Sequence, residues 1–335
     1  MLRPSVSEMK TILITGGTGF IGSNLAAALV SQGYHVKILR RATSQTALID
    51  HLNVEHCIGD VRDIASLRTA MQKCDTVFHT AAIVSFWKSL RQLQHEVNVH
   101  GTKNVADACL ETGVKRLVHT SSIAALGHPV ADKPADENTA YNWEHLSDGY
   151  KASKHLAEIE IEKAIAFGLD AVIINPAVVI GPGDIHFSGG SIIRSVHRGL
   201  VPFYIKGGMN VVYVSDVVNA HIAAATKGRT GEHYIAGGEN LTHKHVFQIT
   251  AEIIGKRAPQ FELPVSLLKL AAKGFDAAGA IFRKEPLISS ELVAGAGIYN
   301  WYSSAKAQRE LGYQFTPFRE AVLKTYQWYR EHKLL

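Results

Sequence analysis

The sequence lacks the features of several protein classes. Its three cysteines, Cys57, Cys74 and Cys109, have no metal-ligand spacing and do not suggest a disulfide framework, so we expect reduced thiols. The 35 basic and 30 acidic residues give a formal net charge of +5. They are spread along the chain without a basic block interleaved with aromatic residues, so nucleic acid is not an expected partner.

Long apolar runs are also missing. The N-terminal stretch MLRPSVSEMK has no apolar signal-peptide segment, so we expect a cytoplasmic protein. The most apolar later stretch, residues 264–282, is interrupted by Lys269, Lys273 and Asp276, and falls short of the ~18 apolar residues that a membrane span needs. We predict an amphipathic helix there, without stable membrane insertion; a position on a membrane surface or beside a substrate pocket stays open.

What the sequence does contain is a regular alternation of two patterns. Runs rich in β-branched residues predict strands at 11–15, 35–39, 54–60, 76–82, 116–122 and 170–176. Helical patterns lie between them at 20–32, 64–73, 90–112 and 149–167. This alternation predicts an α/β protein with a Rossmann-type, doubly wound parallel sheet.

A glycine-rich turn follows the first predicted strand. Gly16, Gly19 and Gly22 stand between that strand and a helix, in the spacing G-x-x-G-x-x-G. Glycines also end strands for structural reasons alone, but here a second strand follows the helix. In this context they allow a tight turn and a close approach of the backbone to a pyrophosphate. The sequence therefore favours a nucleotide cofactor.

The end of the second strand bears on the choice of cofactor. An acidic residue there would bind the ribose of NAD, whereas this chain has Arg40 and Arg41, which suit the 2′-phosphate of NADP. We therefore favour NADP(H), with NAD(H) possible, because the arginines can also be ordinary surface residues. Asp60 ends the third strand and can accept a hydrogen bond from adenine; Asp60 or Asp63 can equally cap the next helix.

A serine, a tyrosine and a lysine form the candidate catalytic group. Ser121 and Ser122 end the fifth strand, at the sheet edge where α/β proteins bind ligands, and Tyr150 and Lys154 follow one helical turn apart. The lysine charge can lower the pKa of the phenol, and the serine can hydrogen-bond a reacting carbonyl. A Y-x-x-x-K pair alone is often a solvated helix surface; the preceding motifs favour a proton-transfer pair.

These motifs resemble those of the extended short-chain dehydrogenase/reductases, also called the NAD-dependent epimerase/dehydratase superfamily. The matching stretches are TGGTGFIGS, GDVRD, HTAA, NVHGTKN, TSSIAALG, YKASK, NPAVVIGPGD and VVYVSDVVNAH, in the family's order from residue 11 to about 221. The resemblance implies an NAD(P)-dependent oxidoreductase acting on CH–OH or C=O groups. It implies a domain at 10–180 that binds NAD(P) and carries the catalytic residues. Residues 181–335 would then form a smaller, mostly substrate-binding lobe, interleaved with the first domain.

The resemblance also implies roles for individual residues. Ser122, Tyr150 and Lys154 are the implied catalytic residues, with Ser121 the competing serine. The implied cofactor-binding residues are Gly16, Thr18, Gly19, Phe20, Ile21, Gly22, Arg40, Asp60, Val61, Ala81, Ala82, Asn98, Ser121, Tyr150, Lys154, Pro176 and Val179.

Departures from the family's motifs narrow the expected activity. The Asp-Glu pair of nucleotide-sugar dehydratases is absent at Ser122-Ile123. Met209 stands where epimerases have an arginine that binds the substrate diphosphate, and Leu126 where they tend to have a tyrosine. The aromatic residues Phe86, Trp87, Phe187, Phe203 and Tyr204 are each more often core, but together fit an uncharged carbonyl substrate. We therefore expect NADPH-dependent reduction of an apolar aldehyde or ketone, as in dihydroflavonol 4-reductase-like members.

Other functions stay open at this point. The alternative activity is a nucleotide-sugar or hopanoid-associated sugar epimerase, and a non-catalytic NADP sensor would be a different class of protein. The histidines at 233, 243 and 245 have neither the i, i+4 spacing nor the carboxylate partner of a metal motif, so we expect no metal. The family resemblance makes a homodimer plausible.

Overall fold

The computed structural model describes residues 10–129, 133–143, 149–286 and 288–335. Its centre is a seven-stranded sheet in which every neighbouring pair is parallel. The strand order is β10 (His233–Ala236), β6 (Ala171–Pro176), β5 (Arg116–Thr120), β4 (Thr76–His79), β1 (Thr11–Thr15), β2 (His35–Arg40) and β3 (Glu55–Ile58). The predicted Rossmann-type α/β fold is confirmed.

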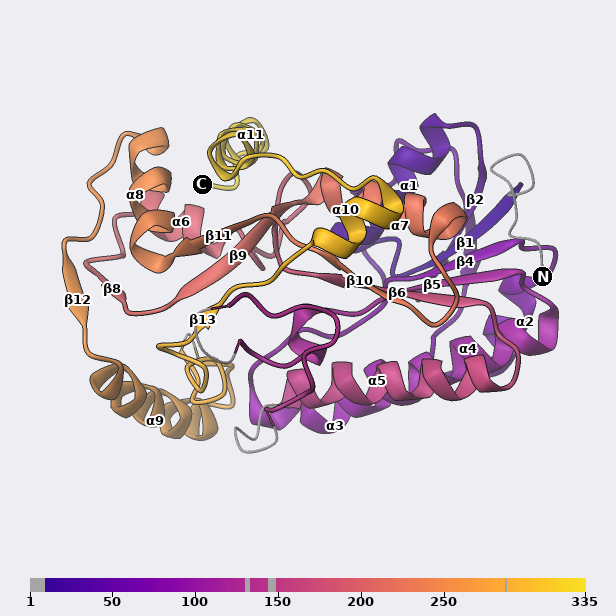
Figure 1. Ribbon diagram of the computed structural model, residues 1–335, viewed down its shortest axis with the longest axis horizontal. Coiled ribbons are helices and arrows are strands. Elements are labelled where there is room, and N and C mark those ends of the chain that lie inside the picture. The colour runs from indigo at the N-terminus through magenta and orange to yellow at the C-terminus, as the bar shows by residue number, and fades with distance from the viewer. Residues whose placement is uncertain (1–9, 130–132, 144–148, 287) are drawn as a thin grey trace.

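Helices cover both faces of this sheet (Figure 1). One face carries α1 (Phe20–Ser31), α7 (Val214–Lys227) and α10 (Ala305–Leu311); the other carries α2 (Ile64–Met71), α4 (Gly101–Thr112) and α5 (Gly149–Ala166). Side chains of β1 alternate between the two layers, since Ile12 and Ile14 join the first core and Leu13 the second. A strand buried on both faces reads as a continuous apolar run, as this one does.

The predicted helix at 90–112 is divided. It consists of η2 (Lys88–Leu90), α3 (Arg91–Gln94), a π-helical turn η3 (His95–His100) and α4. The π-turn places Asn98 in the interior, and such turns are frequent at functional sites. The seventh strand, β10, was not predicted, because its four residues come after the regular part of the alternation.

A second group of elements lies at one end of the sheet. Strands β7 (Val178–Ile180), β9 (Gly208–Tyr213), β11 (Glu239–Thr242) and β13 (Tyr299–Asn300) form a small sheet, and β8 (Phe203–Ile205) pairs with β12 (Phe261–Leu263). Helices α6 (Ser191–His197), α8 (His243–Ile254) and α11 (Phe318–Glu331) share a third core with it. The predicted amphipathic helix is α9 (Val265–Phe282).

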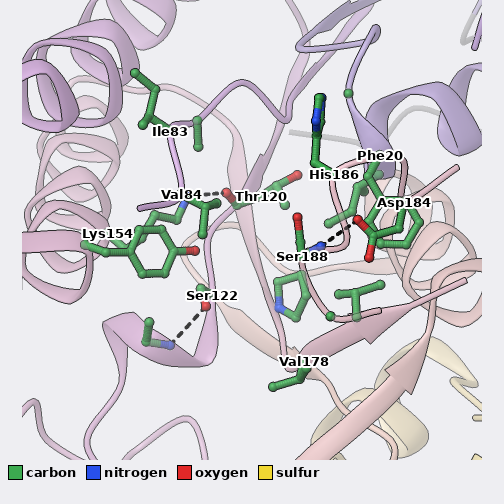
Figure 2. A pocket seen from close by; sticks show the side chains of 18 of the residues that line it. Phe20, Ile83, Val84, Thr120, Ser122, Lys154, Val178, Asp184, His186 and Ser188 are labelled. Carbon is green, nitrogen blue, oxygen red and sulfur yellow. Dashed lines mark hydrogen bonds between the residues drawn. The ribbon is translucent and has the colours of Figure 1, made fainter. Parts of the chain in front are cut away.

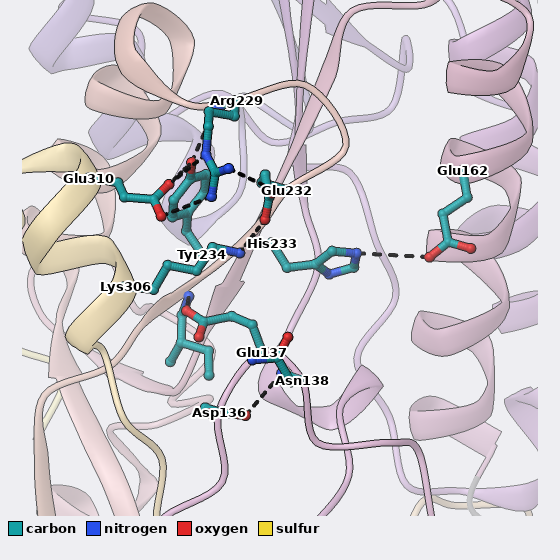
Figure 3. Close-up of polar contacts among 11 residues, drawn as sticks. Asp136, Glu137, Asn138, Glu162, Arg229, Glu232, His233, Tyr234, Lys306 and Glu310 are labelled. Carbon is teal, nitrogen blue, oxygen red and sulfur yellow. Dashed lines mark hydrogen bonds and ion pairs between the residues drawn. The ribbon is translucent and has the colours of Figure 1, made fainter.

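Polar contacts attach the late segments to the first sheet (Figure 3). Glu310 on α10 accepts hydrogen bonds from Arg229 and from the Tyr234 hydroxyl on β10, and Lys306 pairs with Glu232. On the other side of β10, Glu137 accepts a hydrogen bond from the main-chain nitrogen of Ile235. The first sheet is therefore completed by residues from the second half of the chain. Among the described helices, none is long and apolar enough to cross a membrane.

Candidate active site

The glycine turn has the geometry that a dinucleotide requires. Gly16 has φ +73°, and a Cβ there would lie 2.6 Å from the main-chain nitrogen of Ala81. A Cβ on Gly22 would lie 2.3 Å from the Gly16 oxygen, so the first turn of α1 packs directly on the turn. A side chain at Gly16 or Gly22 would therefore clash with the backbone and fill the space that a pyrophosphate needs.

The beginning of α1 is open to a ligand. Its N-cap is Gly19, which offers no side-chain cap to the first-turn N–H groups. Those donors and the positive end of the helix dipole suit a pyrophosphate. The predicted residues Thr18, Phe20 and Ile21 line the pocket beside Gly16, Gly19 and Gly22. The protein residues present therefore fit a dinucleotide cofactor.

The adenosine end lies at β2 and β3. Arg40, Arg41, Asp60 and Val61 all line the pocket, as do Thr43 and Ser44. The Asp60 carboxylate binds Arg62 at 2.9 Å and 3.1 Å, and this hydrogen-bonded partner holds the carboxyl pKa below its usual range. Asp60 is therefore already paired with a residue that the sequence analysis did not single out.

Arg40 is partly fixed in place by its neighbours. Its Nε donates to His56 on β3 at 3.0 Å, and its guanidinium also donates to the Arg41 main-chain oxygen. Arg41 is exposed, and its main-chain nitrogen donates to the Ser44 hydroxyl at 3.1 Å. Only Asp60 and Asp184 are acidic among the described lining residues. No unpaired carboxylate of the described residues therefore occupies the ribose position.

The candidate catalytic residues meet where β5 ends and α5 begins. Ser121, Ser122, Tyr150 and Lys154 all line the pocket, and the Tyr150 ring contacts the Phe86 ring edge-on with centroids 5.6 Å apart. Lys154 and Ser122 lie on the same side of the pocket, while Phe20, His186 and Asp184 lie across it (Figure 2). The Ser122 hydroxyl accepts a 3.1 Å bond from the Ala124 main-chain nitrogen.

Lys154 is buried at this point. Its Nζ donates to the Thr120 main-chain oxygen at 2.7 Å. Burial lowers its pKa to about 8, and the charge of Glu158 opposes that change. A buried ammonium that titrates near neutrality is a strong charge to place near a phenol.

A buried carboxyl lies one helical turn beyond the lysine. Burial raises the pKa of Glu158 to about 7, against a hydrogen bond from Asn175 that favours the ionised form. The Asn175 amide donates to Glu158 at 2.7 Å and to the Ser122 main-chain oxygen at 3.0 Å. His233 lies between Glu158 and the exposed Glu162, and Figure 3 shows its contact with Glu162. Burial lowers the His233 pKa to about 4, so its ring is neutral at pH 7.

Asn98 is a supporting residue, outside the lining of the pocket. Its amide accepts from the Ile83 main-chain nitrogen at 2.8 Å, and donates to the Ile83 oxygen and the Ser153 hydroxyl, each at 3.0 Å. Ser153 in turn donates to the Tyr150 main-chain oxygen. Asn98 therefore joins the strand-end loop of β4 to the first turn of α5. The remaining predicted cofactor residues, Ala81, Ala82, Pro176 and Val179, line the pocket.

The substrate half differs from the expectation in detail. Of the five aromatic residues expected there, only Phe86 lines the pocket. Phe187 instead packs on Tyr329 in the third core. The other three, Trp87, Phe203 and Tyr204, lie outside the lining. The spacing of aromatic residues in the sequence does not predict which of them face a cavity and which face the core. The aromatic and aliphatic residues present instead are Trp143, Phe247, Leu268, Leu292, Val293 and Tyr302, from segments far apart in sequence.

The whole cleft has a volume of about 1390 Å³. Its described arginines, Arg40, Arg41 and Arg62, all belong to the adenosine end. Met209 does line the pocket at the expected arginine position, and His243 lies nearby with its pKa lowered by burial. Within the described ranges, no three histidine, cysteine or acidic side chains are grouped as a metal site.

Comparisons with known proteins identify the family. Residues 12–237 match the NAD dependent epimerase/dehydratase family. A Synechocystis protein named "Putative dihydroflavonol 4-reductase" is 34% identical over 98% of this chain and 96% of its own length. "Sterol demethylase protein B" of Methylococcus capsulatus is 32% identical over 97% of this chain and all of its own length.

Solved structures agree with this assignment. The crystal structure of gox2253 has a TM-score of 0.86 and 35% identity, covering 97% of this chain and 99% of its own. A Thermus thermophilus UDP-glucose 4-epimerase in complex with NAD has a TM-score of 0.76 and 26% identity, covering 96% and 99%. The chain belongs to the NAD-dependent epimerase/dehydratase family of extended short-chain dehydrogenase/reductases, as a dihydroflavonol 4-reductase-like, NAD(P)-dependent oxidoreductase.

Proposed function

We propose that this protein reduces an apolar aldehyde or ketone to the alcohol with NADPH, and that Tyr150 donates the proton. The observation that carries the proposal is the contrast between the two halves of the cleft. The described arginines line the adenosine end, whereas the half beyond Tyr150 has no arginine among its described lining residues. Phe86, Trp143, Phe247 and aliphatic residues line it together with the polar Lys151, Asn210 and His243. A diphosphate needs charge-assisted donors, and an apolar carbonyl compound does not.

The roles of the protein residues follow from their positions. A bound nicotinamide supplies the hydride. The Tyr150 hydroxyl donates a proton to the carbonyl oxygen, and Ser122 stabilises the negative charge that develops there. The Lys154 ammonium favours the ionised phenol, which brings its proton affinity closer to neutral pH and assists the reverse oxidation.

NADP(H) is the preferred cofactor in this proposal. Arg40 and Arg41 supply two guanidinium groups at the end of β2, and Thr43 and Ser44 add hydroxyl donors beside them. The one carboxylate nearby, Asp60, is paired with Arg62. The Thermus relative is a complex with NAD, so NAD(H) is the alternative that cofactor measurements must exclude.

The name of one relative supports a large substrate. The Methylococcus protein is named for sterol demethylation, and the apolar side chains in the half of the cleft beyond Tyr150 suit a polycyclic alcohol or ketone better than a sugar nucleotide. A sterol-like ketone is therefore the first compound to try in the assay.

The test is a substrate panel followed by NADPH absorbance. Sterol-like, aromatic and aliphatic ketones and aldehydes should give turnover, and Tyr150→Phe should not. UDP- and GDP-sugars are assayed in parallel for epimerisation. Turnover of a sugar nucleotide without reduction of any apolar carbonyl would assign the protein to the epimerases instead.

A further inference from the structure

The outer face of α9 is an exposed apolar stripe. Five large side chains are largely accessible: Leu267 (53%), Leu270 (67%), Phe275 (42%), Ile281 (76%) and Phe282 (72%). At 100° per residue they fall within an arc of about 140°, together with Ala271 and Gly274. Contiguous apolar surface of this kind marks an interaction site, whereas single exposed residues do not.

The inner face of the same helix belongs to the cleft. Leu268 and Ala272 are buried in a small core with Val293, and Leu268, Leu292 and Val293 line the pocket that contains Tyr150. The helix therefore separates the apolar half of the cleft from the surroundings by its own thickness. A partner of the outer face would therefore lie one helix thickness from the apolar half of the cleft.

Basic residues border the stripe. Lys273 lies about 60° beyond one edge of the stripe, and Arg283 and Lys284 follow the end of α9; all three are exposed. Lys269 is also exposed but lies farther round the helix. Asp276, the acidic residue within the helix, accepts hydrogen bonds from the Ser290 main-chain nitrogen. Glu285 follows Lys284 and accepts a hydrogen bond from the Ser85 hydroxyl, so the balance of charge beside the apolar stripe stays positive.

We propose that the outer face of α9 binds the surface of an anionic membrane. Apolar side chains beside lysines match the interface between acyl chains and anionic headgroups. A second copy of the chain is a poorer partner, because a two-fold interface through this face would bring the lysines of both copies together. The helix lies in the interface without spanning the bilayer. That it also delivers a membrane-dissolved substrate rests on the proposed function.

The experiment measures binding of the protein, without cofactor or substrate, to lipid vesicles. We expect flotation with vesicles of phosphatidylcholine plus phosphatidylglycerol, weaker flotation with phosphatidylcholine alone, and release by salt. Leu270→Glu combined with Phe282→Glu should lower the vesicle partition coefficient at least ~10-fold, since two apolar contacts are replaced by repelled carboxylates. Phe167→Glu is the matched control, because Phe167 is 82% exposed after the end of α5.

Distinct results would overturn the proposal. Absence of flotation by the wild type, or equal flotation of the double variant with a native circular dichroism spectrum, would show that α9 is not a membrane-binding face. A concentration-dependent dimer that the double variant dissociates, without vesicle binding, would assign the face to a second copy. Because no turnover is measured, the reductase assignment can fail without affecting this result.

Discussion

The Lys154 ammonium donates a 2.7 Å hydrogen bond to the main-chain oxygen of Thr120. The bond joins the first turns of α5 to the end of β5, where Ser121 and Ser122 follow. Since the lysine side chain is otherwise flexible, this contact fixes the position of the charge. The pH dependence of the enzyme should therefore report on this buried ammonium together with Glu158, which lies one helical turn away.

The rate of carbonyl reduction should fall as the pH rises above about 8. Burial lowers the Lys154 pKa to about 8, so its charge is present below that pH and lost above it. Glu158 raises the lysine pKa, so Glu158→Gln should move the alkaline limb of kcat/KM to lower pH. Glu162→Gln, at an exposed position on the same helix, should leave the limb in place. A profile that stays flat to pH 10 would contradict the role of Lys154.

Tyr150→Phe should lower kcat at least ~10²-fold, because general acid–base catalysis is typically worth 10²–10⁴. The variant retains the ring that contacts Phe86, so the fold and cofactor binding should persist. Cofactor titration by fluorescence serves as the control. A variant that keeps most of its kcat on a good ketone would mean that Tyr150 is not the acid.

Arg40→Asp should weaken NADPH binding ~10-fold or more, because it replaces a charge-assisted donor with a like charge to phosphate. Binding of NADH should change much less. Arg309→Asp makes the same change of net charge on the exposed surface of α10, and should leave both affinities unchanged. Equal losses for NADPH and NADH would remove the basis for NADP selectivity.

Asn98→Ala should lower the free energy of unfolding by roughly 1–3 kcal/mol, since it leaves part-buried main-chain groups of Ile83 without these partners. Asn138→Ala, at an exposed position, should change it by less than ~0.5 kcal/mol. Chemical denaturation measures both. A stable Asn98→Ala protein would show that the π-turn does not depend on this amide.

The local parts of the site were predictable from the sequence. The glycine turn and the Tyr150–Lys154 pair depend on residues close together in the chain, so their spacing carries the geometry. Trp143, Phe247 and Val293 reach the cleft only through tertiary packing, which no short pattern records. Phe187 was misplaced for the same reason, because an aromatic residue packs equally well in a core. The pairing of Asp60 with Arg62 could have been inferred from their two-residue spacing beside the strand end.

The position of β10 has a consequence for biosynthesis. Strand β6 pairs with β5 on one side and with β10 on the other. The ribosome makes residues 171–176 well before residues 233–236, so the nascent chain carries an open strand edge in the interval. An unpaired strand edge can form hydrogen bonds with strands of other chains and so promotes aggregation. The sheet can close only after residues 233–236 have left the exit tunnel, and chaperones that shield strand edges would act during that delay.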